Sequence, residues 1–104
     1  MWIEDLKRNF ETLDKGERIA ALIENISGLA NDKRGILELS HLLNLEFSLT
    51  AKRESGSRYL HELGNAKEDI DIRARMNFRS KKLEAESFQR ALREFRFVLS
   101  CAGD

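Results

Sequence analysis

Residues with reactive side chains are few in this sequence and lie far apart. His41 and His61 are the two histidines of the 104-residue chain, and Cys101 is its one cysteine. A zinc site usually takes four Cys or His ligands at close spacing, which this set does not provide. A reactive thiolate needs a base and electropositive surroundings, whereas Cys101 lies on the tail of the last expected helix. We therefore predict structural or surface roles for all three residues, and no metal ion.

The acidic pairs of the sequence do not indicate catalysis either. Asp69/Asp71 and Glu84/Glu86 have a spacing too common to suggest general acid–base chemistry. The sequence also lacks a glycine-rich loop of the kind that holds phosphate groups. We expect no enzymatic activity, no catalytic residue and no cofactor, so function is expected to depend on interaction surfaces.

Basic residues gather in the last third of the chain. Residues 73–82 contain five basic side chains and no acidic one, and three arginines recur further along at a spacing of three. These residues are Arg73, Arg75, Arg79, Lys81 and Lys82, followed by Arg90, Arg93 and Arg96. Such a patch can follow the phosphate backbone of a nucleic acid, with Tyr59 or Phe78 stacking on a base. Alternatively, these charges form the solvated face of amphipathic helices and pair with the surplus acidic residues of 36–72.

The composition is that of one helix-rich domain covering residues 1–104. Charged residues make up 35% and apolar residues 41%, there is no proline, and 18 basic residues balance 18 acidic ones; the chain is too apolar to be disordered. No apolar run approaches the roughly 20 residues of a membrane helix. A single cysteine excludes an internal disulfide and fits a reducing compartment. We expect a cytoplasmic protein without a membrane partner.

The most apolar element is a helix expected at about residues 34–49. Its large apolar residues form two helical stripes, namely Ile36, Leu39, Leu43 and Phe47 on one, and Leu42, Leu45 and Leu49 on the other. A surface helix needs one apolar stripe, so other elements must cover this helix from more than one side. We predict an all-α fold, a small bundle of four to five helices around this central buried helix.

Two further helices complete an expected helical core at residues 2–49. The first spans residues 2–13. Asp14 and Glu17 have the spacing of a capping box and would begin the second helix, which Gly28 is expected to end. Asn31 or Asp32 then caps the central helix. Because the connections are short, we expect these three helices to pack as antiparallel neighbours.

The second half of the chain is expected to contain a loop, a short helix and a long helix. The loop covers residues 50–57, and a short helix with a connector covers 58–79, with Gly64 and Asn65 ending the helical turns. Ser80 can cap a C-terminal helix at 80–101. Phe88, Leu92, Phe95 and Leu99 form its apolar stripe.

The apolar residues of the first two helices have two interpretations. They are Trp2, Leu6, Phe10, Leu13, Ile19 and Ile23. Either they belong to the core, or they form an interface, whose centres favour large aromatic side chains. A monomer of this length would have difficulty covering both the central and the first helix, and exposed apolar patches mark interfaces. We therefore predict a symmetric homodimer through these residues, with the last helix and its Phe88, Phe95 and Phe97 as the alternative interface.

A family resemblance supports that prediction. Residues 6–19 combine an aromatic–Glu pair, a bulky residue three positions later, a polar turn and an acid–Arg pair before a leucine-rich helix. This pattern resembles the helical dimerisation domain of Smaug-type translational repressors and of related zinc-knuckle proteins that partner non-canonical poly(A) polymerases. It is also similar to the dimerisation segment of F-box/WD-repeat proteins. Residues 36–47 would match the third helix of the family, and 71–75 a short segment after it.

The resemblance implies a scaffold within a longer regulator of messenger RNA. Such a module would form a homodimer or bind another regulatory protein, and the RNA-reading modules would lie outside these residues. The function expected from the sequence is therefore non-enzymatic protein–protein interaction and homodimerisation in translational regulation. The alternative is a nucleic-acid-binding helical module that uses the basic segment 73–96.

Overall fold

The computed structural model describes the backbone of residues 2–29 and 32–103, and the side chains of residues 4–26, 28–29 and 32–102. Within these ranges the chain forms α1 (Trp2–Asn9), α2 (Lys15–Leu29), α3 (Lys33–Arg53), α4 (Arg58–Arg75) and α5 (Lys81–Ser100). Short 3-10 turns follow α1 at Phe10–Thr12 and α5 at Cys101–Gly103. No strand occurs among the described residues, and the predicted all-α bundle is confirmed.

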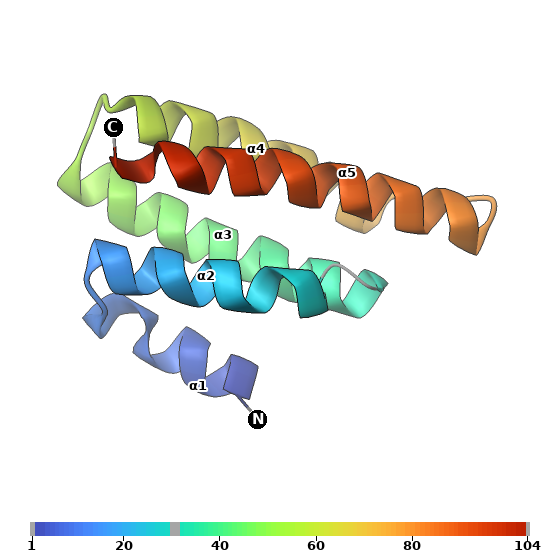
Figure 1. The fold of residues 1–104 in the computed structure, drawn as a ribbon, viewed down its shortest axis with the longest axis horizontal. Coiled ribbons are helices and arrows are strands. Elements are labelled where there is room, and N and C mark those ends of the chain that lie inside the picture. Colours follow the sequence, from blue (N-terminus) through green and yellow to red (C-terminus); the bar gives the residue numbers. More distant parts are fainter. Residues whose placement is uncertain (1, 30–31, 104) are drawn as a thin grey trace.

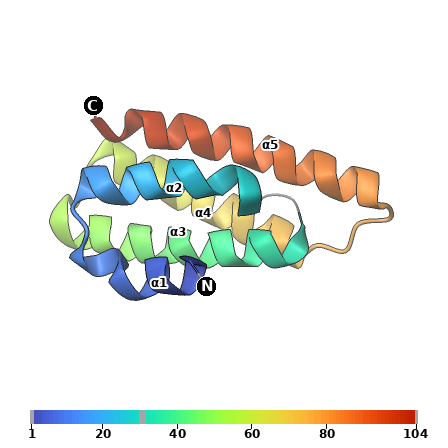
Figure 2. The same ribbon diagram turned by 60° about the horizontal axis from the view of Figure 1, so that its bottom comes forward.

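Helices α2 to α5 form an antiparallel bundle in which each helix packs against the next (Figure 1). The bundle closes because α5 also packs against α2. Helix α1 lies outside it, beside α2 and α3 and away from α4 and α5 (Figures 1 and 2). The expected antiparallel succession is present, because α2 runs opposite to both α1 and α3 (Figure 1).

An ion pair holds α1 to α3. Lys7 Nζ on α1 lies 2.6 Å from Glu38 Oε2 on α3. The hydrogen bond to this carboxylate raises the pKa of Lys7 above its ordinary value. Phe10 adds an apolar anchor directly after α1, since its side chain is completely buried. Leu6 of α1 also packs against the core, so the first helix is attached to the bundle by both polar and apolar contacts.

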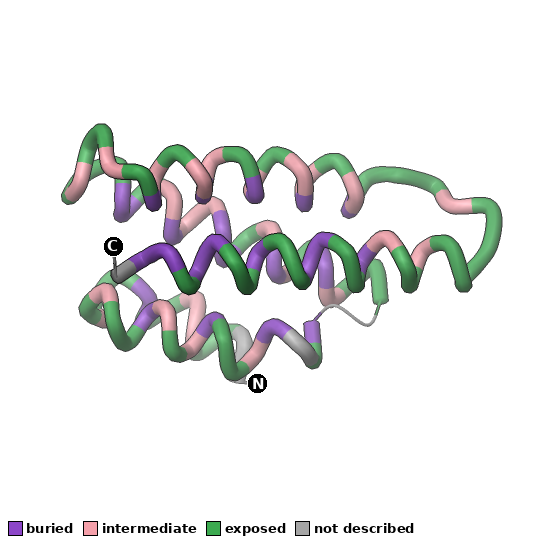
Figure 3. The backbone as a smooth tube through the Cα atoms, turned by 45° about the horizontal axis from the view of Figure 1, so that its top comes forward, coloured by how far each residue is buried: buried purple, intermediate pink, exposed green. Residues whose placement is uncertain are grey.

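Helix α3 is the central helix, as predicted, and packs against both α2 and α4. Both expected stripes contribute buried residues, namely Ile36, Leu39, Leu42, Leu43 and Leu49. Leu45 and Phe47 are partly buried and pack against the same core. Figure 3 shows buried positions recurring along α4 and α5 as well. The helices of a single chain therefore cover both faces of α3, and the expected difficulty of covering it without a second chain does not arise.

Side-chain caps explain where the helices begin. The predicted capping box is present, because Glu17 N–H donates to Asp14 Oδ1 at 2.8 Å and Asp14 N–H donates to Glu17 Oε1 at 3.0 Å. The caps of α3, α4 and α5 are Asp32, Ser57 and Ser80. Each accepts a hydrogen bond from an N–H that the helix itself leaves unpaired. Asp32 and Ser80 were expected as caps from the sequence.

The second half of the chain departs from the predicted boundaries. Helix α3 continues to Arg53, so the expected loop at 50–57 is shorter, and α4 is one continuous helix where a short helix and a connector were predicted. Its core side consists of Tyr59, Leu63, Ala66, Ile70 and Ala74. Because alanines occupy two of these positions, the stripe is weak in the sequence. The predicted helix 80–101 agrees with α5 to within one residue at each end.

Two glycines were expected to end helices and do not. Gly28 lies within α2, which continues to Leu29. Gly64 lies inside α4, beside Phe47 of α3. A Cβ atom at position 64 would lie 3.1 Å from Phe47 Cε2, so glycine here permits close packing of α4 on α3 rather than a helix end.

Candidate functional site

The residues with reactive side chains are not brought together. His41 and His61 are exposed on α3 and α4, whereas Cys101 is a buried free thiol after α5. In the part of the chain that the structure describes, no three His, Cys, Asp or Glu side chains are grouped so that they could hold a metal ion.

Within that same part, no helix has both the length and the apolar character needed to cross a membrane.

The residues expected at a dimer interface do not share one exposed surface. Phe10 is 0% exposed, so its assignment to an interface was wrong, because the turn after α1 carries its ring into the core. Leu6, Leu13 and Ile19 are partly buried and pack against that core. Ile23 is 49% exposed on α2, and the side chain of Trp2 lies outside the described part of the structure. On this side of the molecule, Ile23 is thus the one expected interface residue described as exposed.

The last helix exposes one of its three phenylalanines. Phe88 and Phe95 are buried, whereas Phe97 is 60% exposed. Phe97 lines a hollow of about 450 Å³ between α4 and α5, which we call the Phe97 groove. Its other lining residues are Glu62, Asn65 and Ala66 from α4, and Arg93, Glu94 and Val98 from α5. The groove therefore combines an exposed aromatic ring with side chains of both charges.

The basic cluster divides into residues with different surroundings. Arg73 is an internal clamp: its Nε donates to Asp69 Oδ2 at 2.9 Å, and its Nη1 donates to the carbonyl oxygen and the Oγ of Ser87 at 3.0 and 2.8 Å. These bonds join α4 to α5. The remaining basic residues are exposed, namely Arg75, Arg79, Lys81 and Lys82 around the α4–α5 turn and Arg90, Arg93 and Arg96 along α5.

The two aromatic residues considered for base stacking also differ. Tyr59 is 3% exposed, so it is not available to a ligand and that role for it was wrong. Phe78 is partly buried and lies edge-on to Phe88, with 6.0 Å between the ring centres. Phe78 therefore remains the aromatic side chain beside the α4–α5 turn.

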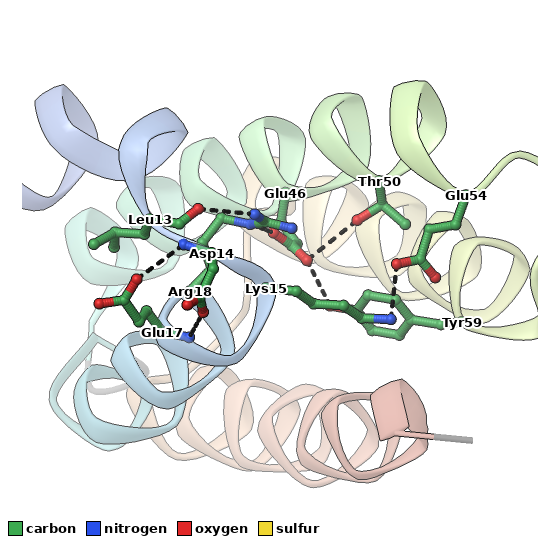
Figure 4. A network of polar contacts seen from close by, with 9 residues as sticks. All are labelled: Leu13, Asp14, Lys15, Glu17, Arg18, Glu46, Thr50, Glu54 and Tyr59. Atoms are coloured by element: carbon green, nitrogen blue, oxygen red, sulfur yellow. Dashed lines mark hydrogen bonds and ion pairs between the residues drawn. The ribbon is translucent and has the colours of Figure 1, made fainter.

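A buried polar network that the sequence analysis did not identify connects α2, α3 and α4 (Figure 4). Arg18 Nε donates to Glu46 Oε1 at 2.5 Å, and Arg18 Nη1 donates to the carbonyl oxygen of Leu13 at 3.1 Å. The second carboxylate oxygen, Glu46 Oε2, accepts from Tyr59 at 2.9 Å and from Thr50 at 3.2 Å. Burial, followed by the charge of Glu46, raises the pKa of Tyr59 well above its ordinary value of 10.0.

The buried network stabilises the packing of the helices and is not a site for a substrate. Arg18, Glu46 and Thr50 are each at most 1% exposed, so a substrate cannot reach them. Lys15 closes the outer side, since its Nζ lies 4.9 Å from the centre of the Tyr59 ring and 2.7 Å from Glu54 Oε2. A buried charged pair can fix the register of packed elements. Here its hydrogen bonds join three helices and the chain segment before α2.

Comparison with models of known protein families finds no match to this chain, and neither do comparisons with curated proteins and with solved structures. The resemblance of residues 6–49 to Smaug-type dimerisation domains stays a prediction from the sequence.

Proposed function

We propose that this domain is a non-enzymatic protein–protein interaction module that forms a homodimer through the α4–α5 face. The observation that carries the proposal is the exposure of Phe97, 60%, inside a hollow between two helices. Aromatic side chains in such positions are typical centres of interfaces. The α1–α2 face is a weaker candidate for the interface, because Phe10 is part of the core.

The charges of the Phe97 groove favour a second copy of the same chain as the partner. Glu62 on α4 and Arg93 on α5 lie on opposite sides of the groove. In a two-fold dimer the same surface meets itself, so the arginine of one protomer can face the glutamate of the other twice. A surface with both charges is thus suited to self-association, whereas a strongly acidic partner would be repelled by Glu62 and Glu94 and a strongly basic one by Arg93.

The size of this face predicts a weak dimer. A helix of 20 residues is about 30 Å long, and two packed helices present a width of about 20 Å. The face therefore offers about 600 Å² per protomer, below the roughly 800 Å² of a standard interface. We expect a dissociation constant in the micromolar range. In the longer regulator of messenger RNA that the resemblance implies, further contacts between the two chains would raise the effective concentration of this domain.

Sedimentation experiments on two matched variants test the proposal. The mass of the wild type should rise from one chain towards two between about 1 and 200 µM. Phe97→Ser should weaken association at least tenfold, whereas Ile23→Ser, a similar change of an exposed residue on α2, should leave it unchanged. The opposite pattern would move the interface to the α1–α2 face. A wild-type mass of one chain at every concentration would contradict self-association.

A further inference from the structure

The α4–α5 turn forms a positively charged tip at one end of the molecule. The first turns of α5 extend beyond the ends of α2 and α3 (Figures 1 and 2). Four exposed basic side chains surround this turn: Arg75, Arg79, Lys81 and Lys82. We call these four residues the basic tip. No acidic residue occurs in the sequence between positions 72 and 83.

The charges of the basic tip are poorly compensated. Among the described residues, Arg75, Arg79 and Lys82 form no ion pair. Lys81 Nζ lies 3.7 Å from Glu84 Oε1, but the lysine side chain is 95% exposed. The attraction within such a solvent-exposed ion pair is weak. Several cations elsewhere have close acidic partners, as in the pairs Lys7–Glu38 and Lys15–Glu54. The tip therefore presents a local positive potential despite the balanced net charge of the chain.

A hollow of about 280 Å³ lies beside the tip. Its apolar walls are Phe78 and Leu83, and its polar lining consists of Arg73, Glu86, Ser87 and Arg90. Leu83 is 47% exposed. Arg73 is held in place by its bonds to Asp69 and Ser87, so this side of the hollow is preorganised. A flat ring can pack on the apolar walls while its edge forms hydrogen bonds with the polar groups.

We propose that the basic tip and this hollow bind single-stranded nucleic acid, with phosphate groups on the tip and one base in the hollow. Binding of single strands combines a positively charged path for the backbone with surfaces on which bases pack. The apolar walls of Phe78 and Leu83 next to the polar lining favour a flat base with hydrogen-bonding edges. An anionic membrane or an acidic peptide would use the charges of the tip alone, and both are competitors in the tests below. This surface is separate from the Phe97 groove, which lies near the other end of α5.

Salt dependence gives the first test. Each phosphate neutralised on a single strand contributes about −0.7 to the slope of log affinity against log salt. Four phosphates on the basic tip therefore predict a slope of about −2.8, or a loss of affinity of about 50-fold between 50 and 200 mM salt. Fluorescence anisotropy with a labelled oligouridine of about 12 nucleotides measures this slope. Absence of binding at 50 mM salt would overturn the proposal.

Matched variants locate the site. Arg79→Gln with Lys82→Gln should weaken binding at least tenfold and reduce the slope to about −1.4, because two phosphate contacts are lost. Lys52→Gln with Arg53→Gln removes the same charge at the end of α3, on the opposite end of the molecule (Figure 1), and should leave binding within twofold. Equal effects of both pairs would show general attraction to the protein and contradict a site at the tip.

A third variant separates the hollow from the charges. Leu83→Ser changes an exposed side chain and should weaken binding about threefold to tenfold while the salt slope stays the same. Phe97→Ser should keep the intrinsic affinity of each protomer for oligouridine, which distinguishes this proposal from the dimer proposal.

Vesicles of phosphatidylcholine with phosphatidylserine and soluble polyglutamate serve as competing probes. If either binds the tip more tightly than oligouridine does at equal charge, the nucleic-acid assignment is wrong.

Discussion

The guanidinium of Arg18 and the carboxylate of Glu46 form an ion pair of 2.5 Å that is closed off from water, with the two side chains 1% and 0% exposed. One side chain comes from α2 and the other from α3, 28 positions apart in sequence. Glu46 also accepts bonds from Thr50 and from Tyr59 of α4 (Figure 4). The core of this small bundle is thus polar towards the end at which α2 and α4 begin.

Removing the charge of Glu46 should destabilise the fold strongly. Glu46→Gln keeps the size of the side chain but leaves the Arg18 guanidinium buried without a counter-charge. Breaking a buried pair in this way costs about 3–5 kcal/mol, a large part of the 5–15 kcal/mol expected for a domain of this size. Urea denaturation followed by circular dichroism measures the change in the free energy of unfolding.

Two further variants separate the pair from other effects. Glu68→Gln, on the exposed side of α4, should change stability by less than about 0.5 kcal/mol. Arg18→Met combined with Glu46→Leu should recover part of the lost stability, because an apolar pair carries no desolvation cost, although the buried hydroxyls of Thr50 and Tyr59 lose their acceptor. A loss below about 1 kcal/mol in Glu46→Gln would mean that water reaches the pair in solution.

The titration of Tyr59 should reveal the same network. Its pKa is raised by burial and by the nearby carboxylate of Glu46, so the folded state favours the neutral phenol. A pKa that is higher in the folded than in the unfolded chain stabilises the fold below pH 10, and this contribution is lost as pH rises above that value. Tyr59 is the one tyrosine of the chain, so absorbance at 295 nm reports it directly. We expect no phenolate signal until the protein unfolds at alkaline pH.

A Tyr59→Phe variant serves as the control for that experiment. Its stability should be lower by about 0.5–1.5 kcal/mol at neutral pH, since Glu46 loses one hydrogen bond. The further loss of stability above pH 10 should be smaller than in the wild type, because the phenol is absent. Titration of the wild-type absorbance near pH 10 with intact helical structure would contradict burial of the hydroxyl group.

Helix periodicity made much of this fold predictable, and its failures have local causes. The two apolar stripes of the central helix and the cap at Ser80 are strong signals because they depend on residue type and spacing alone. Gly64 was misread since glycine has two uses, ending a helix or allowing close packing, and the choice depends on Phe47 of another helix. The continuity of α4 was missed because small residues such as Ala66 and Ala74 contribute little to an apolar pattern.

The candidate surfaces were predictable to a smaller extent. The basic segment was visible in the sequence, but the internal role of Arg73 depends on Ser87 across a helix pair. Phe10 was assigned to an interface but is fully buried, whereas Phe97, which lies outside the apolar stripe of the last helix, is exposed. Glu46 did leave a signal, because it occupies a core position of α3 one turn after Leu42 and Leu43. Its partner Arg18 has no such pattern, since it reaches the core from the first turn of α2.

Two glycines in helices should respond oppositely to alanine. A Cβ atom at Gly35 would lie 1.9 Å from the carbonyl oxygen of Leu29, so α3 cannot keep its place against the end of α2. Gly35→Ala should therefore destabilise by more than about 2 kcal/mol. At Gly28 a Cβ atom meets nothing within 4 Å, and Gly28→Ala should stabilise α2 by about 0.5–1 kcal/mol. Thermal unfolding of the two variants under one condition compares them, and equal shifts would contradict the close approach at Gly35.

The last prediction separates the structural arginine of the basic segment from its surface neighbour. Arg73 makes bonds to Asp69 and Ser87 that tie α4 to α5, whereas Arg75 two positions later is exposed on the same helix. Arg73→Gln should lower the free energy of unfolding by about 1.5–3 kcal/mol, because hydrogen bonds of a charged group are lost from a partly buried site. Arg75→Gln removes the same charge and should change it by less than about 0.5 kcal/mol.

Oligouridine binding should show the reverse order for these two variants at temperatures where both are folded. Arg75 belongs to the basic tip, so Arg75→Gln should reduce the salt slope by about 0.7. Arg73 is already paired with Asp69 at 2.9 Å and neutralises no phosphate, so Arg73→Gln should leave the slope unchanged, although a loosened hollow lowers the affinity. Helical content from circular dichroism confirms folding before each titration. If Arg73→Gln changed the slope and Arg75→Gln did not, Arg73 would be a ligand-binding residue and its clamp between α4 and α5 would open when the ligand binds.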